Sequence, residues 1–379
     1  MERHIVHCDL DTFFVSVERL LHSDLNGKPV LVGGFSERSV VASCSYEARL
    51  FGVHAAMSMK QARRLCPQAV VVRGDFDQYT KYSRIVTEII EGSSPVVEKA
   101  SIDEHYIDLT GMDKYFGCWK WTQELRQRII KETGLPISFA LSANKTVSKI
   151  ATGEAKPCNE KKVDNGKEKQ FLAPLSIKKI PMVGSETYSR LKSMGIATIK
   201  TLQEIDPEMM QILLGANGLL IWRKANGLDD TAVQPYQEQK SMSKEHTYEQ
   251  DTIDMELLQR TIARMVDELS FELRTSKKLS GNISIKIRYS NFETFTKQQK
   301  ITYTCSAKTL EERAMTLFKR VYTKRLLIRL IGVKVSDLVS GAYQINLFDD
   351  TEEDLALTNA LDSIRLRFGK GKIIRGSCF

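Results

Sequence analysis

The spacing of apolar residues changes along the chain, and the first part mixes short apolar runs with longer helical patterns. The run Ile5–Cys8 predicts a buried strand, because it is short, apolar and β-branched. Similar runs and three helical patterns follow, so we expect a mixed α and β region. The expected strands are 30–32, 40–43, 70–72, 96–100, 106–109 and 137–141, and the expected helices are 60–65, 79–91 and 119–133.

From Leu175 to Asp229 the apolar residues follow helical spacing with short turns between the segments. The turn Ile180–Gly184, with helices expected at 186–193 and 199–205, is typical of a helix-hairpin-helix. In that motif the N–H groups of the turn and of the following helix start face a DNA phosphate. Two ordinary packed helices are the alternative, and Met182 stands where glycine is common.

The region 241–341 changes pattern again and predicts the order βαββαβ. In the expected strand 283–289, apolar residues alternate with Ser284, Lys286, Arg288 and Ser290, so one face packs on helices and the other is small and basic. The next strand adds Lys297 or Lys300 to this face, depending on register, and the last strand adds Lys334. The expected strands are 241–247, 283–289, 295–304 and 329–335, and the expected helices are 255–274 and 310–325.

Composition narrows the class of protein without naming a function. The 379 residues are 42% hydrophobic and 27% charged, as in ordinary globular proteins. No run of about 18 apolar residues predicts a membrane span, and seven scattered cysteines without a CxxC pair favour a reducing compartment. The net charge is +8, and region 241–341 holds 18 Lys and Arg against 12 Asp and Glu. This basic excess points to a polyanionic partner for that region.

Two acidic elements are the first candidates for chemistry. Asp9 and Asp11 lie at the end of the first expected strand, where residues two apart point the same way. Asp103 and Glu104 lie between two further expected strands. If these strand ends are neighbours, the carboxylates can hold two divalent cations and support phosphoryl transfer. Either element alone is equally well a solvated turn.

Two further elements carry groups that suit phosphate oxygens. In the run Ser43–Val53, Tyr46 and Arg49 are three residues apart and share one face of an expected helix start. Lys156 precedes Pro157 near a soft boundary, where the segment 157–169 is expected to be loop. Neither element is distinctive without the others.

Together these motifs resemble those of the Y-family translesion DNA polymerases, in the bacterial DNA polymerase IV (DinB-type) branch. The resemblance covers residues 1–350 and joins five motifs in the family's order. They are 9–14 (DLDTFF), 43–53, 100–104 (ASIDE), 155–157 (AKP) and 180–184 (IPMVG).

The resemblance implies an α+β multidomain fold shaped like a right hand, with a βαββαβ little-finger domain and a helix-hairpin-helix in the thumb. The implied domains are the palm, small fingers, helical thumb, linker, little finger and C-terminal tail. The palm is expected at 1–11 and 75–166, the fingers at 12–74 and the thumb at 167–232. The linker is expected at 233–240, the little finger at 241–341 and the tail at 342–379.

The resemblance also assigns roles. Asp9, Asp103 and Glu104 match the catalytic carboxylates, which with the Leu10 carbonyl hold two Mg²⁺ ions, for which Mn²⁺ can substitute. Asp11 matches an acidic position that is not a principal ligand, which corrects the simple reading of the Asp9–Asp11 pair. Phe14 matches the steric gate against ribonucleotides, with core packing beside Phe13 as the alternative. The expected triphosphate contacts are Ser43, Tyr46, Arg49 and Lys156, and the expected DNA contacts are Gly184, Lys286, Arg288 and Lys334.

The tail contains Gln344, Leu347 and Phe348 in the pattern QxxLF, which resembles the peptide that docks bacterial polymerases on the sliding clamp. The implied protein is a cytoplasmic monomer that binds primed DNA and dNTPs, has no proofreading and makes errors. A two-metal nuclease or phosphohydrolase and a catalytically silent DNA- and clamp-binding protein are the rival hypotheses. His105 departs from the small residue usual in the family, and is expected either to alter the electrostatics of the site or to face solvent.

Overall fold

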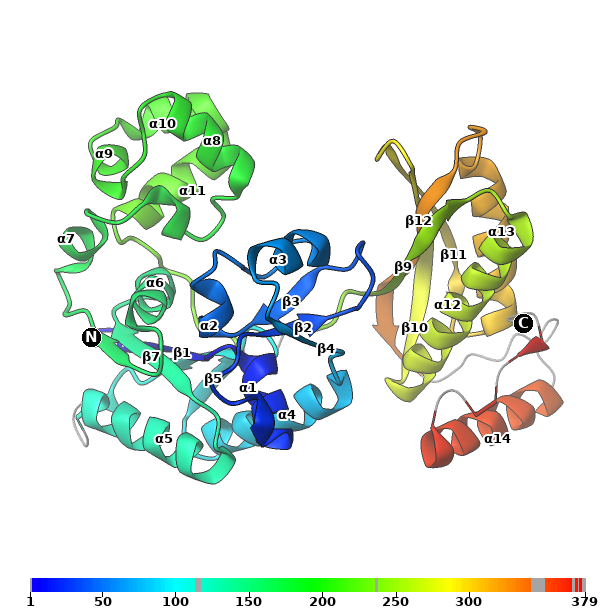
Figure 1. The fold of residues 1–379 in the computed structure, drawn as a ribbon, viewed down its shortest axis with the longest axis horizontal. Coiled ribbons are helices and arrows are strands. Elements are labelled where there is room, and N and C mark those ends of the chain that lie inside the picture. The colour runs from blue at the N-terminus through cyan, green and yellow to red at the C-terminus, as the bar shows by residue number, and fades with distance from the viewer. Residues whose placement is uncertain are drawn as a thin grey trace. The chain divides into compact units, whose positions relative to one another are not determined.

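The structure is a computed structural model that describes residues 2–112, 117–235, 238–341, 352–369, 372–373 and 375–376. The chain divides into two compact units, Met1–Gln237 and Glu238–Phe379, which are described separately (Figure 1). Within the described ranges, no helix combines the length and the apolar character needed to cross a membrane.

A five-stranded sheet organises the first unit, in the order β5-β6-β1-β7-β8. The central strand β1 is antiparallel to both of its neighbours, β6 and β7. The strand β8 lies in the segment expected to be loop, so that expectation was wrong. A short edge strand tolerates the charged residues that suggested a loop, because one of its sides stays in water. The strands are β1 (Ile5–Leu10), β5 (Val96–Lys99), β6 (Glu104–Asp108), β7 (Ile137–Ser142) and β8 (Glu160–Lys162).

Helices cover both faces of this sheet. The residues Val6, Cys8 and Leu10 point into a core formed with α1, α4 and α5. The helix α6 packs on the other face, against β1, β7 and β8 (Figure 1). The alternation along β1 therefore places His7 and Asp9 on the same side as α6. The helices are α1 (Phe13–Leu21), α4 (Phe76–Glu91), α5 (Cys118–Thr133) and α6 (Lys145–Ala155).

A smaller three-stranded sheet, in the order β3-β2-β4, follows α1 and has its own apolar core. Its helix α2 is preceded by Ser45, whose side chain accepts a hydrogen bond from the Ala48 N–H and thereby caps the helix. The elements are the 3₁₀ helix η1 (Ser23–Leu25), β2 (Val30–Gly33), β3 (Val41–Cys44), α2 (Tyr46–Arg49), α3 (Met59–Leu65) and β4 (Val70–Val72).

The rest of the first unit is helical, as the apolar spacing predicted. Its core includes residues of α6, so these helices pack onto the same helix that covers the five-stranded sheet. Met182 adopts a φ of 81°, the backbone conformation for which glycine is usual at this turn. The elements are α7 (Glu168–Leu172), the 3₁₀ helix η3 (Ile177–Lys179), α8 (Ser185–Ser193), α9 (Ile199–Gln203), α10 (Pro207–Leu214) and α11 (Ala216–Ala225).

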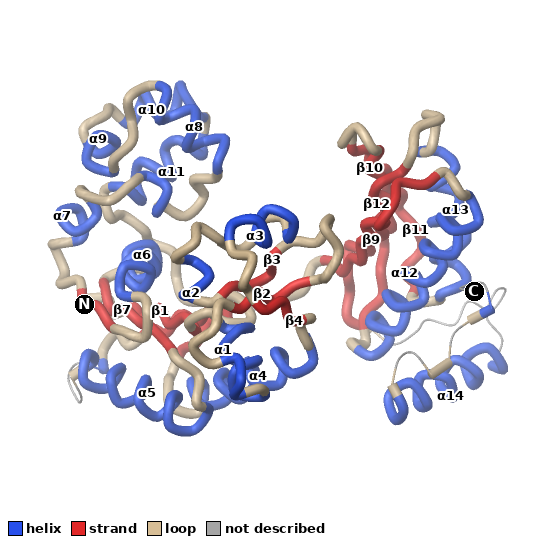
Figure 2. Tube along the Cα trace, in the orientation of Figure 1, coloured by secondary structure: helices blue, strands red, loops and turns tan. Residues whose placement is uncertain are grey.

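The second unit has the predicted order βαββαβ, and its four-stranded sheet runs β11-β10-β12-β9. Both helices lie on one face of the sheet and bury its apolar residues (Figure 2). The first and last strands extend further than predicted, and the second helix ends four residues earlier. The elements are β9 (Ser241–Thr252), α12 (Met255–Thr275), β10 (Lys278–Tyr289), β11 (Thr294–Thr304), α13 (Ala307–Val321) and β12 (Ile328–Ser340).

A last helix, α14 (Glu352–Phe368), is held to α12 by two pairs of charged side chains. Arg274 donates to both carboxylate oxygens of Asp362, at 2.6 and 2.9 Å. The buried Arg365 donates to Asp267, with the shorter bond at 2.7 Å. The predicted clamp-binding residues Gln344, Leu347 and Phe348 lie outside the described residues.

Candidate active site

The register of the five-stranded sheet brings two predicted carboxylates together. Asp9 is the direct partner of Glu104 across β1 and β6, although 95 positions separate them in the sequence. The Leu10 N–H donates to the backbone oxygen of Asp103 at 3.0 Å, so Asp103 adjoins the same strand end. The expectation that the two acidic elements meet at neighbouring strand ends is therefore confirmed for Asp9 and Glu104.

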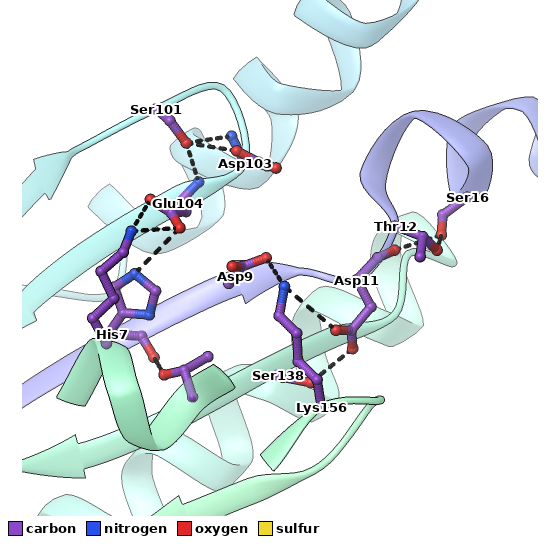
Figure 3. Close-up of polar contacts among 12 residues, drawn as sticks. His7, Asp9, Asp11, Thr12, Ser16, Ser101, Asp103, Glu104, Ser138 and Lys156 are labelled. Atoms are coloured by element: carbon purple, nitrogen blue, oxygen red, sulfur yellow. Dashed lines mark hydrogen bonds and ion pairs between the residues drawn. The ribbon is translucent and has the colours of Figure 1, made fainter. Parts of the chain in front are cut away.

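Lysine side chains hold two of these carboxylates. Lys156 places its Nζ 2.5 Å from Asp9 Oδ1, and Lys149 donates to both oxygens of Glu104, at 2.6 and 2.7 Å. Figure 3 shows the Asp9 carboxylate turned toward Lys156, with Glu104 on the other side. Burial raises the pKa of Asp9 to about 7, and Lys156 opposes the shift while Glu104 and Asp103 add to it. Negative charge is thus crowded here, which is the condition that favours a bound cation.

Asp103 is held by a turn between β5 and β6. The hydroxyl of Ser101 donates to Asp103 Oδ1 at 2.5 Å, and its oxygen accepts the backbone N–H groups of Asp103 and Glu104 at 3.3 and 3.0 Å. Because one serine closes the turn around both acidic residues, their backbone positions are tied to each other.

Asp11 has a different environment from Asp9, although both carboxylates lie near Lys156 (Figure 3). Asp11 is buried and accepts three hydrogen bonds, from the hydroxyls of Ser138 and Tyr46 and from the Cys158 N–H, at 2.7, 3.1 and 2.6 Å. These bonds use both of its oxygens to join β7, α2 and the segment after Lys156. The geometry of Asp11 therefore suits a positioning residue.

Two elements that carry predicted triphosphate contacts, α2 and the segment after α6, meet Asp11. The Tyr46 hydroxyl donates to Asp11, and burial raises the pKa of this phenol above its usual value. The Arg49 guanidinium lies 4.8 Å from the centre of the Tyr46 ring and is exposed. Ser43 lies in β3, opposite Val32 of β2. The structure thus brings Tyr46 and Lys156 together at Asp11, with Arg49 over the Tyr46 ring.

Phe13 and Phe14 differ in burial, although both pack against the same core. Phe13 is fully part of the core, whereas Phe14 is only half-buried. The Phe14 ring stacks on Tyr79 with their centroids 4.2 Å apart and the planes at 10°. Phe14 is therefore fixed in orientation while keeping an open side.

His105 faces neither solvent nor the carboxylates. Alternation along β6 turns it away from Glu104 and toward α4, where its Nε2 lies 3.0 Å from the Thr87 hydroxyl. Only 1% of its surface is exposed, and burial lowers its pKa to about 4. The expectation that it might face solvent was wrong, because β6 is an interior strand with helices on both sides.

The predicted DNA contacts lie in two places. Gly184 is exposed and directly precedes α8. It has no side chain to cap the helix, and its carbonyl accepts the Tyr188 N–H at 2.9 Å. Lys286, Arg288 and Lys334 share the face of the second unit's sheet that its helices leave uncovered. The register also places Lys300, opposite Asn282, on that face, and Lys297, opposite Ile285, on the other. Lys286 forms an ion pair with Glu245 at 2.8 Å.

The sequence interpretation missed Lys149, although a signal was present. Lys145, Lys149 and Lys156 recur at helical spacing, but α6, which carries the first two and ends just before the third, was not among the helices predicted. Only the contact across to β6 shows which carboxylate Lys149 pairs with.

Comparisons with known proteins place the chain in a family. Residues 8–153 match the impB/mucB/samB family, and residues 239–347 match the C-terminal domain of that family. A DNA polymerase IV of Dehalococcoides mccartyi is 36% identical over the whole of this chain and 98% of its own length. A DNA polymerase IV of Treponema denticola is 35% identical, over 89% of this chain and 86% of its own length.

Solved structures agree on the fold. A Y-family DNA polymerase chimera superposes with a TM-score of 0.81 at 24% identity, over 89% of this chain and all of its own. DinB from Sulfolobus solfataricus superposes with a TM-score of 0.61 at 23% identity, with the same coverage. The chain therefore belongs to the impB/mucB/samB family and has the fold of the Y-family DNA polymerases, as its motifs predicted.

Proposed function

We propose that this protein is a template-directed, error-prone translesion DNA polymerase that transfers dNMP from a dNTP to a primer 3′-hydroxyl and does not proofread. The full-length similarity to proteins named DNA polymerase IV supports this activity. The observation that carries it is the pairing of Asp9 with Glu104 at the end of β1, with Lys156 bonded to Asp9 and Tyr46 bonded to the nearby Asp11. Carboxylates next to cationic and hydroxyl groups suit phosphoryl transfer, which depends on position and charge.

The family implies that divalent metal ions are required, and the residues fit them. Among the residues described, no three His, Cys, Asp or Glu side chains are grouped as a metal site. The ammonium groups of Lys156 and Lys149 instead occupy oxygens of Asp9 and Glu104, where they stand in for a cation. Hard oxygen donors of this kind suit Mg²⁺, with Mn²⁺ as a substitute.

Asp9 and Asp103 would hold both ions, Glu104 one of them, and the Leu10 carbonyl the ion bound to the nucleotide. When bound, two such ions lower the pKa of the attacking hydroxyl and neutralise the triphosphate. Lys156 carries a positive charge at this position and is available to a phosphate once it leaves Asp9. Tyr46, Arg49 and Ser43 complete the proposed triphosphate contacts.

Phe14 is the proposed steric gate, because it is half-buried and held against Tyr79. Replacing it with alanine removes the ring that would meet a ribose 2′-hydroxyl. We expect Phe14→Ala to incorporate ribonucleotides at least about tenfold more efficiently relative to dNTPs, a change of about 1.4 kcal/mol in the barrier. Unchanged discrimination in single-nucleotide kinetics would contradict the assignment.

The remaining proposals concern partners. Primed DNA would contact Gly184 in the first unit and Lys286, Arg288 and Lys334 in the second, through phosphates that basic side chains neutralise. Gln344, Leu347 and Phe348 would bind the bacterial sliding clamp. We propose a monomer that acts in the cytoplasm, with domains at the bounds predicted from the sequence.

Primer extension tests this function and separates it from its rivals. A primed template, dNTPs and Mg²⁺ should give distributive extension with the wild type and none with Asp103→Ala. Primer shortening would favour a two-metal nuclease or phosphohydrolase. Retained DNA binding without any synthesis by the wild type would favour a catalytically silent DNA- and clamp-binding protein.

A further inference from the structure

One face of α6 presents a row of lysines to the five-stranded sheet. Lys145, Lys149 and Thr152 are spaced by four and three residues, and Lys156 follows four residues later, just after the helix ends. Residues at this spacing share one face of a helix. The Thr152 hydroxyl donates to the His7 backbone oxygen at 3.0 Å, which holds this face against β1.

Each lysine in the row meets a carboxylate from a different strand. Lys145 donates to Glu98 of β5 at 2.6 and 2.7 Å, and Lys149 donates to Glu104 of β6 at the same two distances. Lys156 pairs with Asp9 of β1. The row thus forms three ion pairs across three adjacent strands, and two of the three carboxylates are proposed metal ligands.

The middle pair differs from its neighbours. Glu98 is not a proposed ligand, and it also accepts the Gln234 N–H at 2.8 Å, so the Lys145 pair is structural. Lys156 has an alternative partner in the triphosphate. Lys149 differs from both, because its partner Glu104 is a proposed ligand and the proposed function gives Lys149 no phosphate to bind instead. Its ammonium group engages both oxygens of Glu104.

Little else in the described part of the chain is placed to hold Glu104. His7 lies with its Nε2 3.9 Å from Glu104 Oε1, beyond hydrogen-bond distance.

We propose that Lys149 is a positioning residue that competes with the divalent ion for Glu104. The inference rests on the proposed function, because it takes Glu104 as a metal ligand. In the protein without DNA and nucleotide, the ammonium holds the carboxylate in place and occupies its oxygens. A divalent ion binds Glu104 only as Lys149 withdraws, so the lysine weakens metal binding until substrate supplies further ligands.

Metal binding without substrate tests this competition. The electron paramagnetic resonance signal of unbound Mn²⁺ gives a dissociation constant for the full chain in the absence of DNA and dNTP. Lys149→Met keeps the length of the side chain and removes its charge, and we expect it to bind Mn²⁺ at least about fivefold more tightly. Lys149→Arg should stay within about twofold of the wild type, because a guanidinium still pairs with the carboxylate.

Two controls separate competition at Glu104 from a general change in charge. Lys179→Met removes one charge from another ion pair on α6, with Glu154 at 2.9 Å, and should change the constant less than about twofold. In a Glu104→Gln background, the effect of Lys149→Met should also fall below about twofold, because the two residues act as a pair.

The inference is overturned if Lys149→Met binds Mn²⁺ no more tightly than the wild type, or if its gain persists in the Glu104→Gln background. Primer extension by the wild type reports separately on the proposed polymerase. An active wild type whose metal affinity does not respond to Lys149→Met overturns the competition alone, whereas an inactive wild type overturns the proposed function. Circular dichroism and thermal unfolding confirm that each variant is folded.

Discussion

The two large sheets of this protein show the same alternation of apolar and polar residues but place their polar faces differently. In the first unit, α6 covers the face that carries His7 and Asp9, so most charged groups there are half-buried and pair with one another. In the second unit, both helices pack on the apolar face, and Lys286 and Lys334 stay on the uncovered one. Whether a helix packs on the polar face therefore decides if the alternation of apolar and polar residues produces a reactive site or a binding surface.

Burial explains why the consequences differ. A charge out of water is unfavourable unless a partner compensates it, so the covered face contains matched lysines and carboxylates. An exposed charge keeps its hydration and stays available to a mobile polyanion. The comparison leads to three predictions, given in order of expected size.

The largest effect on stability should come from breaking a pair on the covered face. Glu98→Ala leaves Lys145, only 13% exposed, without its carboxylate, and should lower the free energy of unfolding by about 3 kcal/mol. Glu245→Ala breaks the Lys286 pair on the uncovered face and should lower it by less than about 1 kcal/mol. Urea unfolding followed by circular dichroism measures both, and equal losses would contradict the difference between the sheets.

A pH dependence should follow from His105, which lies in the core beneath the first sheet. Its pKa of about 4 is below the ordinary value near 6.5, so the unfolded chain binds more protons between these values. The contribution of His105 to the free energy of unfolding should therefore rise with pH through this window. It should reach its full value above about 6.5 and be lost toward pH 4. The contribution of this one group is about 3 kcal/mol.

His105→Gln keeps a donor for Thr87 but does not titrate, so unfolding measured from pH 4 to 7 should show a shallower rise. His246 in the second unit is the matched control. Burial also lowers its pKa, but it is only half-buried, so His246→Gln should flatten the profile less. A larger effect at His246 would contradict the comparison.

The smallest effect concerns DNA binding by the uncovered face. Lys334→Gln removes one proposed phosphate contact and should weaken binding of primed DNA several-fold, with the slope of log affinity against log salt reduced by about 1. Lys297→Gln removes the same charge from the other face of the sheet and should leave the slope nearly unchanged. Fluorescence anisotropy at several salt concentrations measures both, and equal slopes for the two variants would contradict the assigned face.

The sequence predicted much of the fold and the family of this protein. The βαββαβ order, the helical region that begins near Leu175 and the strand β1 before the first acidic pair follow from local apolar spacing, which the backbone repeats of helix and strand require. The family was also predicted, because several short motifs agreed in order and spacing. Element ends were less well predicted, as at β12, because the sheet decides how far a strand continues.

Tertiary structure decided the relations among the functional residues. Sequence named Asp9 and Glu104, but only the register between β1 and β6 made them direct partners. His105 turned inward because β6 lies between two helix layers, and register alone placed Lys300 rather than Lys297 on the uncovered face. The pairing of Lys149 with Glu104 depends on where α6 packs. Such contacts join residues far apart in the chain, and local spacing carries no information about them.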